Sequence, residues 1–355
     1  MNIKQLLDLT ISSSASDLHI SVGFSPQLRI DGLLAPVSSA SVVTPSEAES
    51  LIYSLLNSYQ KSLFEKNWEL DFGFDYENRA RFRVNIYKQR GYIAASLRLI
   101  PKNIRNIEDT GLPPVVAKLI ELEQGLVLVT GPTGHGKSTT LAALINQINL
   151  TKSVHILTIE DPIEFIYPKA KALVSQRELN SDTQSWSNSL KSALREDPNI
   201  VLIGEMRDYD TIASAMTIAE TGHLVLATLH TNSAAQSIDR IIDVFPENQQ
   251  QQVRSQLSST LEAIISQRLI PTINPGRALA YELLFATPAL RAVIREGKTH
   301  LIDNVIQTSG ESGMVALETS LAILVREGII TAETARNYAL RPQVLTKLLG
   351  SGNIS

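Results

Sequence analysis

A nine-residue glycine-rich segment, GPTGHGKST at residues 131–139, constrains this chain more than any other feature. It follows the apolar run 125–130 directly and leads into the helix-like segment 139–148. The spacing G-x-x-x-x-G-K-[ST] between a strand and a helix predicts a phosphate-binding P-loop, because glycines let backbone N–H groups turn inward at the positive end of the helix. The alternative is a glycine-rich turn that matches by chance, and the flanking strand and helix favour the P-loop. An α/β fold is therefore expected.

Each residue of this loop has an expected place. Lys137 would reach the β- and γ-phosphates, and Ser138 would offer its hydroxyl to Mg²⁺. Thr139 would lie just inside the helix, and the side chain of His135 is expected to face solvent. The predicted nucleotide-binding residues are Gly131, Pro132, Thr133, Gly134, His135, Gly136, Lys137, Ser138 and Thr139.

Four apolar runs alternate with helical segments in the second part of the chain: 125–130, 154–160, 199–205 and 223–230. They lack in/out alternation, so they resemble strands that are buried on both faces. This predicts a mostly parallel sheet covered by helices. After about residue 287 the strand signals stop, and apolar residues at helical spacing predict a small helical end at about 287–345.

The first 100 residues have a different rhythm. Short alternating segments predict strands, and residues 45–58 predict a helix with a Thr-Pro start. The predicted strands are 16–22, 26–32, 69–76, 79–87 and 91–100. The pattern predicts a small α+β domain at 1–100 with a mostly antiparallel sheet. A Pro-containing linker at 101–114 would join it to a second domain at 115–355.

Phosphoryl transfer also needs carboxylates near the metal and the attacking water. Glu205 ends an apolar run, as in a Walker B element, and the carboxyl ends of strands in such a sheet face the P-loop. Since Glu is one methylene longer than the usual Asp, it would contact the metal directly or through water. Glu160, Asp161 and Glu164 follow a second strand, and one of them could polarise the water for in-line attack. The alternative for each is a solvated loop charge or a helix cap.

Two histidines flank the apolar run that ends at residue 230. His230 follows the carboxyl end of this predicted strand, where a sensor of the γ-phosphate would sit. His223 stands at its start, where we expect an ordinary hydrogen-bonded polar group. The separation along one strand is too long for a shared metal ion.

Composition limits the remaining choices. The chain has 355 residues, no cysteine and a formal net charge of −4. The lack of cysteine excludes disulfides, thiolate metal sites and thiol nucleophiles. The near-neutral charge argues against general nucleic-acid binding. No apolar run approaches about 18 residues, and the start lacks a signal peptide, so we expect a cytoplasmic protein that does not span a membrane.

Four motifs in order carry a resemblance to a known family. The segments GPTGHGKSTT, TIEDPIEF, LIGEMRD and ETGHLVLATLHTNSAAQSIDRIIDVFP resemble the Walker A, Asp box, Walker B and His box of secretion-superfamily ATPases. Within that superfamily the chain is most similar to the PilT-like retraction motors of type IV pili, which power twitching motility. ALRAVIREGK at 289–298 resembles a further motif of these motors, with Leu290 where Ile is usual.

The resemblance implies a fold, an activity and partners. It implies an N-terminal PAS-like domain, a RecA-like P-loop ATPase core and a small C-terminal helical region, assembled as a homo-hexamer that hydrolyses ATP with Mg²⁺. Such a motor would work at the cytoplasmic face of the inner membrane, on a platform protein at the pilus base. Carried over by position, Lys137 is the Walker A lysine, Glu205 the Walker B glutamate, Glu164 the catalytic base and His230 the His-box sensor.

A basic segment gains a role from the same resemblance. Residues 79–98 hold six basic side chains and no acid. The resemblance implies that Arg81, Arg83 and Arg98 are arginine fingers for ATP near a neighbouring subunit, where they would neutralise charge on the γ-phosphoryl group. The alternative for each arginine is a solvated sheet face. A nucleic-acid patch is disfavoured, because no aromatic stacking platform recurs there.

Some positions depart from the family pattern, and other functions stay open. His135 stands where Ser is usual, Tyr209 where Leu is common and Glu318 where Asp is frequent. A second retraction-type paralogue shares the core motifs. Assembly and secretion ATPases usually carry a longer N-terminal extension and a four-cysteine zinc element, so the lack of cysteine disfavours them. A nucleic-acid translocase and a non-catalytic nucleotide switch are the alternatives from other classes.

Overall fold

The computed structural model describes residues 1–30, 32–77, 79–100 and 103–350. The chain divides into two compact units. The N-terminal unit comprises Met1–Asn103, Asp161–Ile166 and Glu178–Asp182, and the core unit comprises the rest of the chain. Two short segments from the middle of the sequence therefore belong to the N-terminal unit, which the sequence pattern did not indicate.

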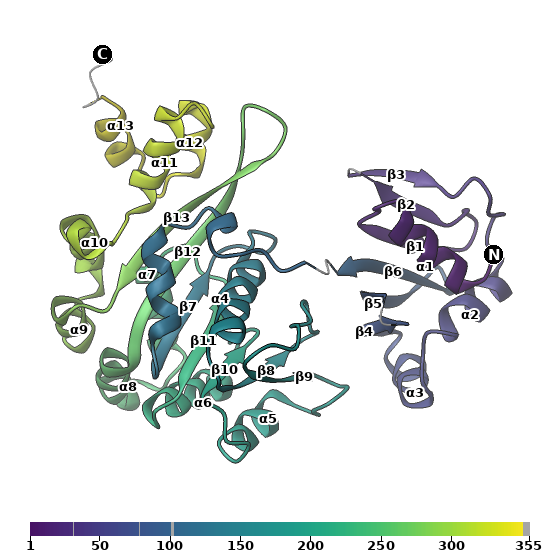
Figure 1. Ribbon diagram of the computed structural model, residues 1–355, viewed down its shortest axis with the longest axis horizontal. Helices are drawn as coiled ribbons and strands as arrows, with labels where there is room; N and C mark the ends of the chain where they lie inside the picture. The colour runs from purple at the N-terminus through teal and green to yellow at the C-terminus, as the bar shows by residue number, and fades with distance from the viewer. Residues whose placement is uncertain (31, 78, 101–102, 351–355) are drawn as a thin grey trace. The chain divides into compact units, whose positions relative to one another are not determined.

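An antiparallel sheet with the strand order β3-β2-β1-β6-β5-β4 forms the N-terminal unit (Figure 1). Its strands are β1 (Asp17–Ile20), β2 (Gln27–Ile30), β3 (Leu33–Pro36), β4 (Glu69–Tyr76), β5 (Ala80–Gln89) and β6 (Tyr92–Ile100), and its helices are α1 (Ile3–Ser12), α2 (Pro45–Tyr53) and α3 (Ser58–Asn67). The apolar faces of helices and sheet share one buried cluster that includes Leu18, Phe64 and Phe82. The expected antiparallel α+β arrangement is confirmed.

The predicted helix 45–58 starts as expected but ends early. The hydroxyl of Thr44 accepts from the N–H of Glu47, and the Glu47 carboxylate accepts from the N–H of Thr44, which is a capping box. The helix ends at Tyr53, and Asn57 caps a new helix, α3. The prediction was wrong over residues 54–57, because the second cap interrupts the apolar spacing.

The described part of the predicted linker contains some ordered structure. Residues 101 and 102 lie outside the described residues, and Glu108–Thr110 (η1) forms a 3₁₀-helix. Ile107 and Leu112 are buried. A second 3₁₀-helix, η2 (Pro114–Glu121), follows directly.

A mostly parallel sheet forms the core unit, with the strand order β13-β12-β7-β11-β10-β8-β9 (Figure 1). The strands are β7 (Gly125–Thr130), β8 (His155–Glu160), β9 (Leu173–Glu178), β10 (Ile200–Ile203), β11 (Leu224–Leu229), β12 (Leu261–Pro271) and β13 (Arg277–Phe285). The ladder from β12 through β7, β11 and β10 to β8 is parallel, and β13 is antiparallel to β12. β7, β10 and β11 are buried along their whole length, which confirms strands covered on both faces.

Helices connect these strands and continue beyond them. Those between strands are α4 (Lys137–Thr151), α5 (Trp186–Ala193), α6 (Tyr209–Glu220), α7 (Ala234–Asp243) and α8 (Glu247–Thr260). After β13 come α9 (Pro288–Arg295), η3 (Thr299–Leu301), α10 (Ile302–Thr308), η4 (Gly310–Ser312), α11 (Leu317–Arg326), α12 (Ala332–Tyr338) and α13 (Pro342–Gly350). In the described part of the chain, up to residue 350, no strand follows β13, as expected.

A buried ionic cluster fastens the last helices to β13. The guanidinium of Arg341 lies 3.3 Å from the Glu282 carboxylate, 3.1 Å from that of Glu318 and 2.6 Å from that of Asp303. The other carboxylate oxygen of Glu282 accepts from the N–H of Ala234, the first residue of α7. Glu318, flagged in the sequence as a departure, is therefore a partner of Arg341.

Within the described residues, no helix combines the length and the apolar composition that crossing a membrane requires.

Candidate functional site

The P-loop connects β7, which ends at Thr130, to α4, which begins at Lys137. Gly131, Gly134 and Gly136 all have positive φ, of 142°, 79° and 86°. A Cβ at position 131 would lie 2.3 Å from the carbonyl oxygen of Gln267, so only glycine fits there. Gly136 is the N-cap of α4. It has no side chain that could accept from the first N–H groups of α4, so the N-cap residue does not cap these groups. These features fit a loop that receives phosphate oxygens at a helix N-terminus.

Lys137 is the best-buried side chain of this loop, with 8% exposure. Its ammonium group donates to the carbonyl oxygens of Gly131 (2.8 Å) and Pro132 (3.0 Å) and lies 3.5 Å from Nδ1 of His230. Ser138 follows it in the first turn of α4, as the motif predicts, and Thr139 is the third residue of that helix.

The expectation that His135 faces solvent was wrong. Its side chain is half-buried, and its Nδ1 accepts a hydrogen bond from the N–H of Leu269 at 3.0 Å. Its carbonyl oxygen accepts from the Gln267 amide at 2.8 Å. The pairing of β12 with β7 ends where Ser266 faces Thr130, so the next residues of β12 are left for the P-loop. His135 bonds to one of these residues, Leu269, beyond the point where β12 pairs with β7.

Glu205 and His230 meet next to the loop. Glu205 follows β10 and His230 follows β11, and because these strands are parallel neighbours their carboxyl ends lie together. Nε2 of His230 lies 3.3 Å from the Glu205 carboxylate, and its Nδ1 lies 3.2 Å from the Thr133 hydroxyl. Arg207 pairs with Glu205 at 2.8 Å.

Charge is concentrated at Glu205. Burial raises the pKa of this carboxyl, but hydrogen bonds and charge from Arg207 and His230 outweigh burial and hold the pKa below its ordinary value. The carboxylate therefore stays ionised, as a metal ligand or a partner of a cation must be. The structure thus brings together three predicted residues, Lys137, Glu205 and His230.

The three acids of the TIEDPIEF segment separate into two groups. Glu160 ends β8 in the core unit, is buried, and accepts from the hydroxyl of Thr158 at 2.7 Å and the amide of Gln176 at 3.3 Å. Asp161 and Glu164 belong to the N-terminal unit.

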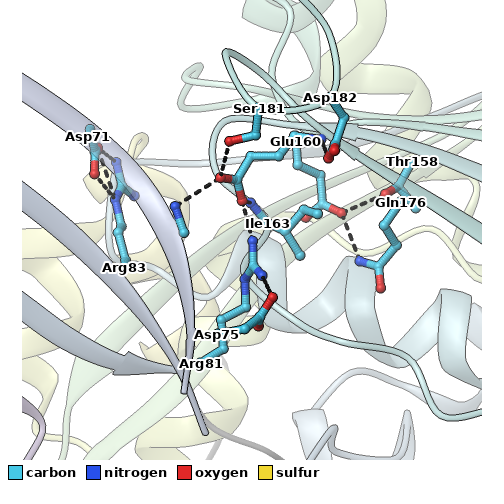
Figure 2. Close-up of polar contacts among 12 residues, drawn as sticks. Asp71, Asp75, Arg81, Arg83, Thr158, Glu160, Ile163, Gln176, Ser181 and Asp182 are labelled. Carbon is cyan, nitrogen blue, oxygen red and sulfur yellow. Dashed lines mark hydrogen bonds and ion pairs between the residues drawn. The ribbon is translucent and has the colours of Figure 1, made fainter. Parts of the chain in front are cut away.

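All three predicted arginine fingers are paired with carboxylates in the N-terminal unit. Arg81 bonds to Asp75 and Glu178, Arg83 to Asp71, and Arg98 to Asp17. Figure 2 shows Arg81 and Arg83 with their aspartates. Arg81 is only 11% exposed, so a solvated sheet face does not describe it.

His223 has the ordinary role that its position suggests. Its Nδ1 lies 3.1 Å from the carbonyl oxygen of Ile218 and 3.2 Å from the Thr221 hydroxyl, just before β11.

Sequence reasoning missed two side chains that hold the site. Gln267 of β12 is buried and bonds to the His135 carbonyl within the loop and to the Thr140 hydroxyl in the first turns of α4. Glu178, at the end of β9, accepts from the N–H of Ile163 beside Glu164. Each acts in part through a backbone group, and such contacts leave no motif in the sequence.

Comparison with known proteins gives concordant matches. Residues 2–276 match the family model described as type II/IV secretion system protein. The chain is 47% identical to the type IV pilus retraction ATPase PilT of Pseudomonas aeruginosa, over 97% of this chain and 99% of that protein. It is 38% identical to the type IV pilus ATPase PilU of the same organism, over 96% of this chain and 89% of that protein.

A solved structure agrees with these matches. The crystal structure of the pilus retraction motor PilT with bound ADP superposes with a TM-score of 0.92 at 43% identity, and the match covers 98% of this chain and 99% of that one.

Proposed function

The chain belongs to the type II/IV secretion system protein family, and on this basis we propose that it is an ATP-hydrolysing motor that powers the retraction of type IV pili. The observation that carries this function is the convergence of Lys137, Glu205 and His230 at a P-loop, in a chain 47% identical to a pilus retraction ATPase. The lower identity to PilU favours retraction of the PilT type over its paralogue.

The site residues take distinct roles in this proposal. Lys137 and the N–H groups of residues 131–139 hold the phosphates of ATP, and His230 senses the γ-phosphate from its contact with Thr133. Glu164 accepts the proton of the attacking water. The residues fit Mg²⁺, because Ser138 offers a hydroxyl and Glu205 an ionised carboxylate. When bound there, Mg²⁺ would neutralise charge on the phosphates.

The larger architecture is proposed from the family. Residues 1–100 form a PAS-like domain, 101–114 a linker and 115–355 a RecA-like core with a helical end. Six copies form a ring in which Arg83 and Arg98 reach ATP held near a neighbouring subunit. Arg81, the third expected finger, is left out of this role because it pairs with Asp75 and Glu178. The ring acts on a platform protein at the cytoplasmic face of the inner membrane. Nucleotide contacts that differ between two angles of the PAS-like domain and core would drive the motion.

Turnover of ATP by purified protein tests the enzymatic part. We expect Lys137→Ala and Glu164→Ala each to lower phosphate release by about a hundredfold or more, because one removes phosphate stabilisation and the other the general base. Light scattering should still report hexamers. Full turnover in either variant would refute the assigned role.

Deletion of the gene tests the cellular part. Cells without the protein should display surface pili that cannot retract, and a Lys137→Ala gene should fail to restore retraction. Cells that lack pili altogether would instead indicate an assembly ATPase.

A further inference from the structure

Glu178 is a buried carboxylate to which neither the family motifs nor the proposed mechanism assigns a role. It ends β9, is 2% exposed and belongs to the N-terminal unit together with Asp161–Ile166. A carboxylate at this depth needs several donors to offset the loss of water.

Donors from three parts of the N-terminal unit converge on Glu178. Its Oε1 accepts from the N–H of Gly73 in β4 at 2.8 Å and from the Ser181 hydroxyl at 3.2 Å. Its Oε2 accepts from the N–H of Ile163 at 3.1 Å and from the guanidinium of Arg81 in β5. Figure 2 shows Ile163, Ser181 and Arg81 close to one another. Ile163 is the residue directly before Glu164.

The face of β5 that carries Arg81 also carries Arg83, because residues two apart on a strand share a face. Arg83 bonds to Asp71 at 2.6 Å. Asp71 raises the pKa of Arg83 most strongly, and Glu164 and Asp161 add to the rise, so both acids lie within electrostatic reach of this strand. The segment 161–166 therefore faces the β4–β5 hairpin.

Gly73 leaves room for the Arg81–Glu178 pair. A Cβ at position 73 would lie 2.2 Å from Nη2 of Arg81 and 2.5 Å from Oε2 of Glu178. Any other residue there would push the pair apart without removing either charge.

We propose that Glu178 is a positioning residue that fastens the segment 161–166 to the β4–β5 hairpin and thereby sets the position of Glu164. This rests on the proposed function, in which Glu164 is the base. Arg81 acts through Glu178: with Asp75 at 2.7 Å on its other side, it is committed to holding the clamp. The clamp consists of Gly73, Arg81, Ile163 and Glu178.

The clamp predicts a particular kinetic effect. A general base must stay within hydrogen-bond reach of the water, and a misplacement of about 1 Å can cost up to about a hundredfold in rate. Binding of ATP depends on the P-loop, which belongs to the core unit. Loosening the clamp should therefore lower kcat per folded molecule and leave KM unchanged. General destabilisation lowers only the folded fraction, so kcat per folded molecule, with the folded fraction measured by circular dichroism, would stay at the wild-type value.

The experiment compares Glu178→Ala and Gly73→Ala with wild type and with Asp8→Asn. The last variant is the matched control, because Asp8 forms an exposed ion pair with Arg79 in the same unit. We expect kcat for ATP to fall about tenfold to a hundredfold in the two clamp variants, with KM within about twofold of wild type. Hydrogen exchange of a peptide covering 161–166 should accelerate in both, since Ile163 loses its acceptor in Glu178→Ala and the acceptor is displaced in Gly73→Ala. The control should match wild type.

Unchanged kcat in both clamp variants, or a rise in KM at constant kcat, would overturn the proposal. If Glu178→Ala does not fold, the kcat and KM of Gly73→Ala test the proposal. If wild type itself fails to hydrolyse ATP, the proposed function falls. The exchange of 161–166 in wild type and Gly73→Ala then still decides whether the clamp exists.

Discussion

At the scale of single residues, the bond between His135 and Leu269 makes the P-loop sensitive to pH. Nδ1 of His135 can accept from the Leu269 N–H only while the ring is neutral. Burial lowers the pKa of His135, and the charges of Lys137, Arg268 and Arg277 lower it further below its ordinary value of 6.5. Because the folded protein has the lower pKa, this stabilisation is present above pH 6.5 and is lost as the pH falls below it.

We expect KM for ATP to rise about threefold to tenfold once the pH falls through the lowered pKa of His135, which lies below 6.5, since a lost hydrogen bond costs about 1 kcal/mol. His135→Asn should flatten this profile, because the Asn oxygen can accept above and below that pKa. Steady-state phosphate release on both sides of the pKa provides the measurement, and protonation of ATP affects both proteins alike. Parallel profiles would show that His135 does not brace the loop.

Residues that belong to a chemical motif could be predicted from the sequence. Residues that act by hydrogen bonding to backbone groups could not. Lys137 was identified from the P-loop motif, and Glu205 and His230 from the ends of apolar strands. The three lie together in the structure, and their catalytic roles remain predictions. Gln267 and Glu178 hold the loop and the Asp box through N–H and C=O groups. A single Gln or Glu within a strand carries no sign of its backbone partner.

At the scale of elements, strong periodicity decided what could be predicted. β4 and β7 were expected at their observed bounds, because alternation or a wholly apolar run is unambiguous. β3, β9, β12 and β13 were missed. In β12 the polar pair Gln267–Arg268 interrupts the apolar run, since Gln267 faces the P-loop and Arg268 donates to the carbonyl of Tyr338. These side chains contact residues that are distant in the sequence, and a local sequence pattern does not contain such partners.

The attachment of the last helices to β13 should depend on pH. Burial raises the pKa of Glu282 to about 7, against the opposing effects of the Ala234 N–H and Arg341. Because the folded pKa exceeds the ordinary value of 4.5, the stability contributed by protonated Glu282 is full at low pH and is lost as the pH rises through about 7. Asp303 and Glu318, which face the same cluster, reinforce this rise.

Glu282→Gln should therefore stabilise the core unit at pH 8 by about 1–3 kcal/mol and have little effect near pH 5. The neutral amide oxygen can still accept from Ala234, and Arg341 keeps Asp303 and Glu318. Urea unfolding at the two pH values measures the difference. An equal effect at both would show that Glu282 does not titrate in this range.

At the scale of the whole molecule, the N-terminal unit is assembled from distant parts of the chain. A fragment of residues 1–103 would lack Glu178, so Arg81 would keep only part of its pairing. We expect Arg81→Leu to destabilise the N-terminal unit of the full chain by about 3 kcal/mol, because the substitution removes the cationic partner of the buried Glu178 carboxylate. In the fragment the same substitution should cost less than about 1 kcal/mol.

Trp68 fluorescence in a Trp186→Phe background can follow the N-terminal unit during urea unfolding, since the chain has two tryptophans. Equal losses in fragment and full chain would show that the segments 161–166 and 178–182 contribute nothing to this unit.

The same arrangement has a consequence for synthesis of the chain. When β6 leaves the ribosome, the N-terminal sheet still lacks the segments that end at residue 182. At about 5–20 residues per second, that interval lasts on the order of ten seconds. During this time Arg81 of the nascent sheet lacks its buried partner Glu178, and chaperones can reach the incomplete sheet. Translation speed across residues 104–182 should therefore influence how much of the protein reaches its native state.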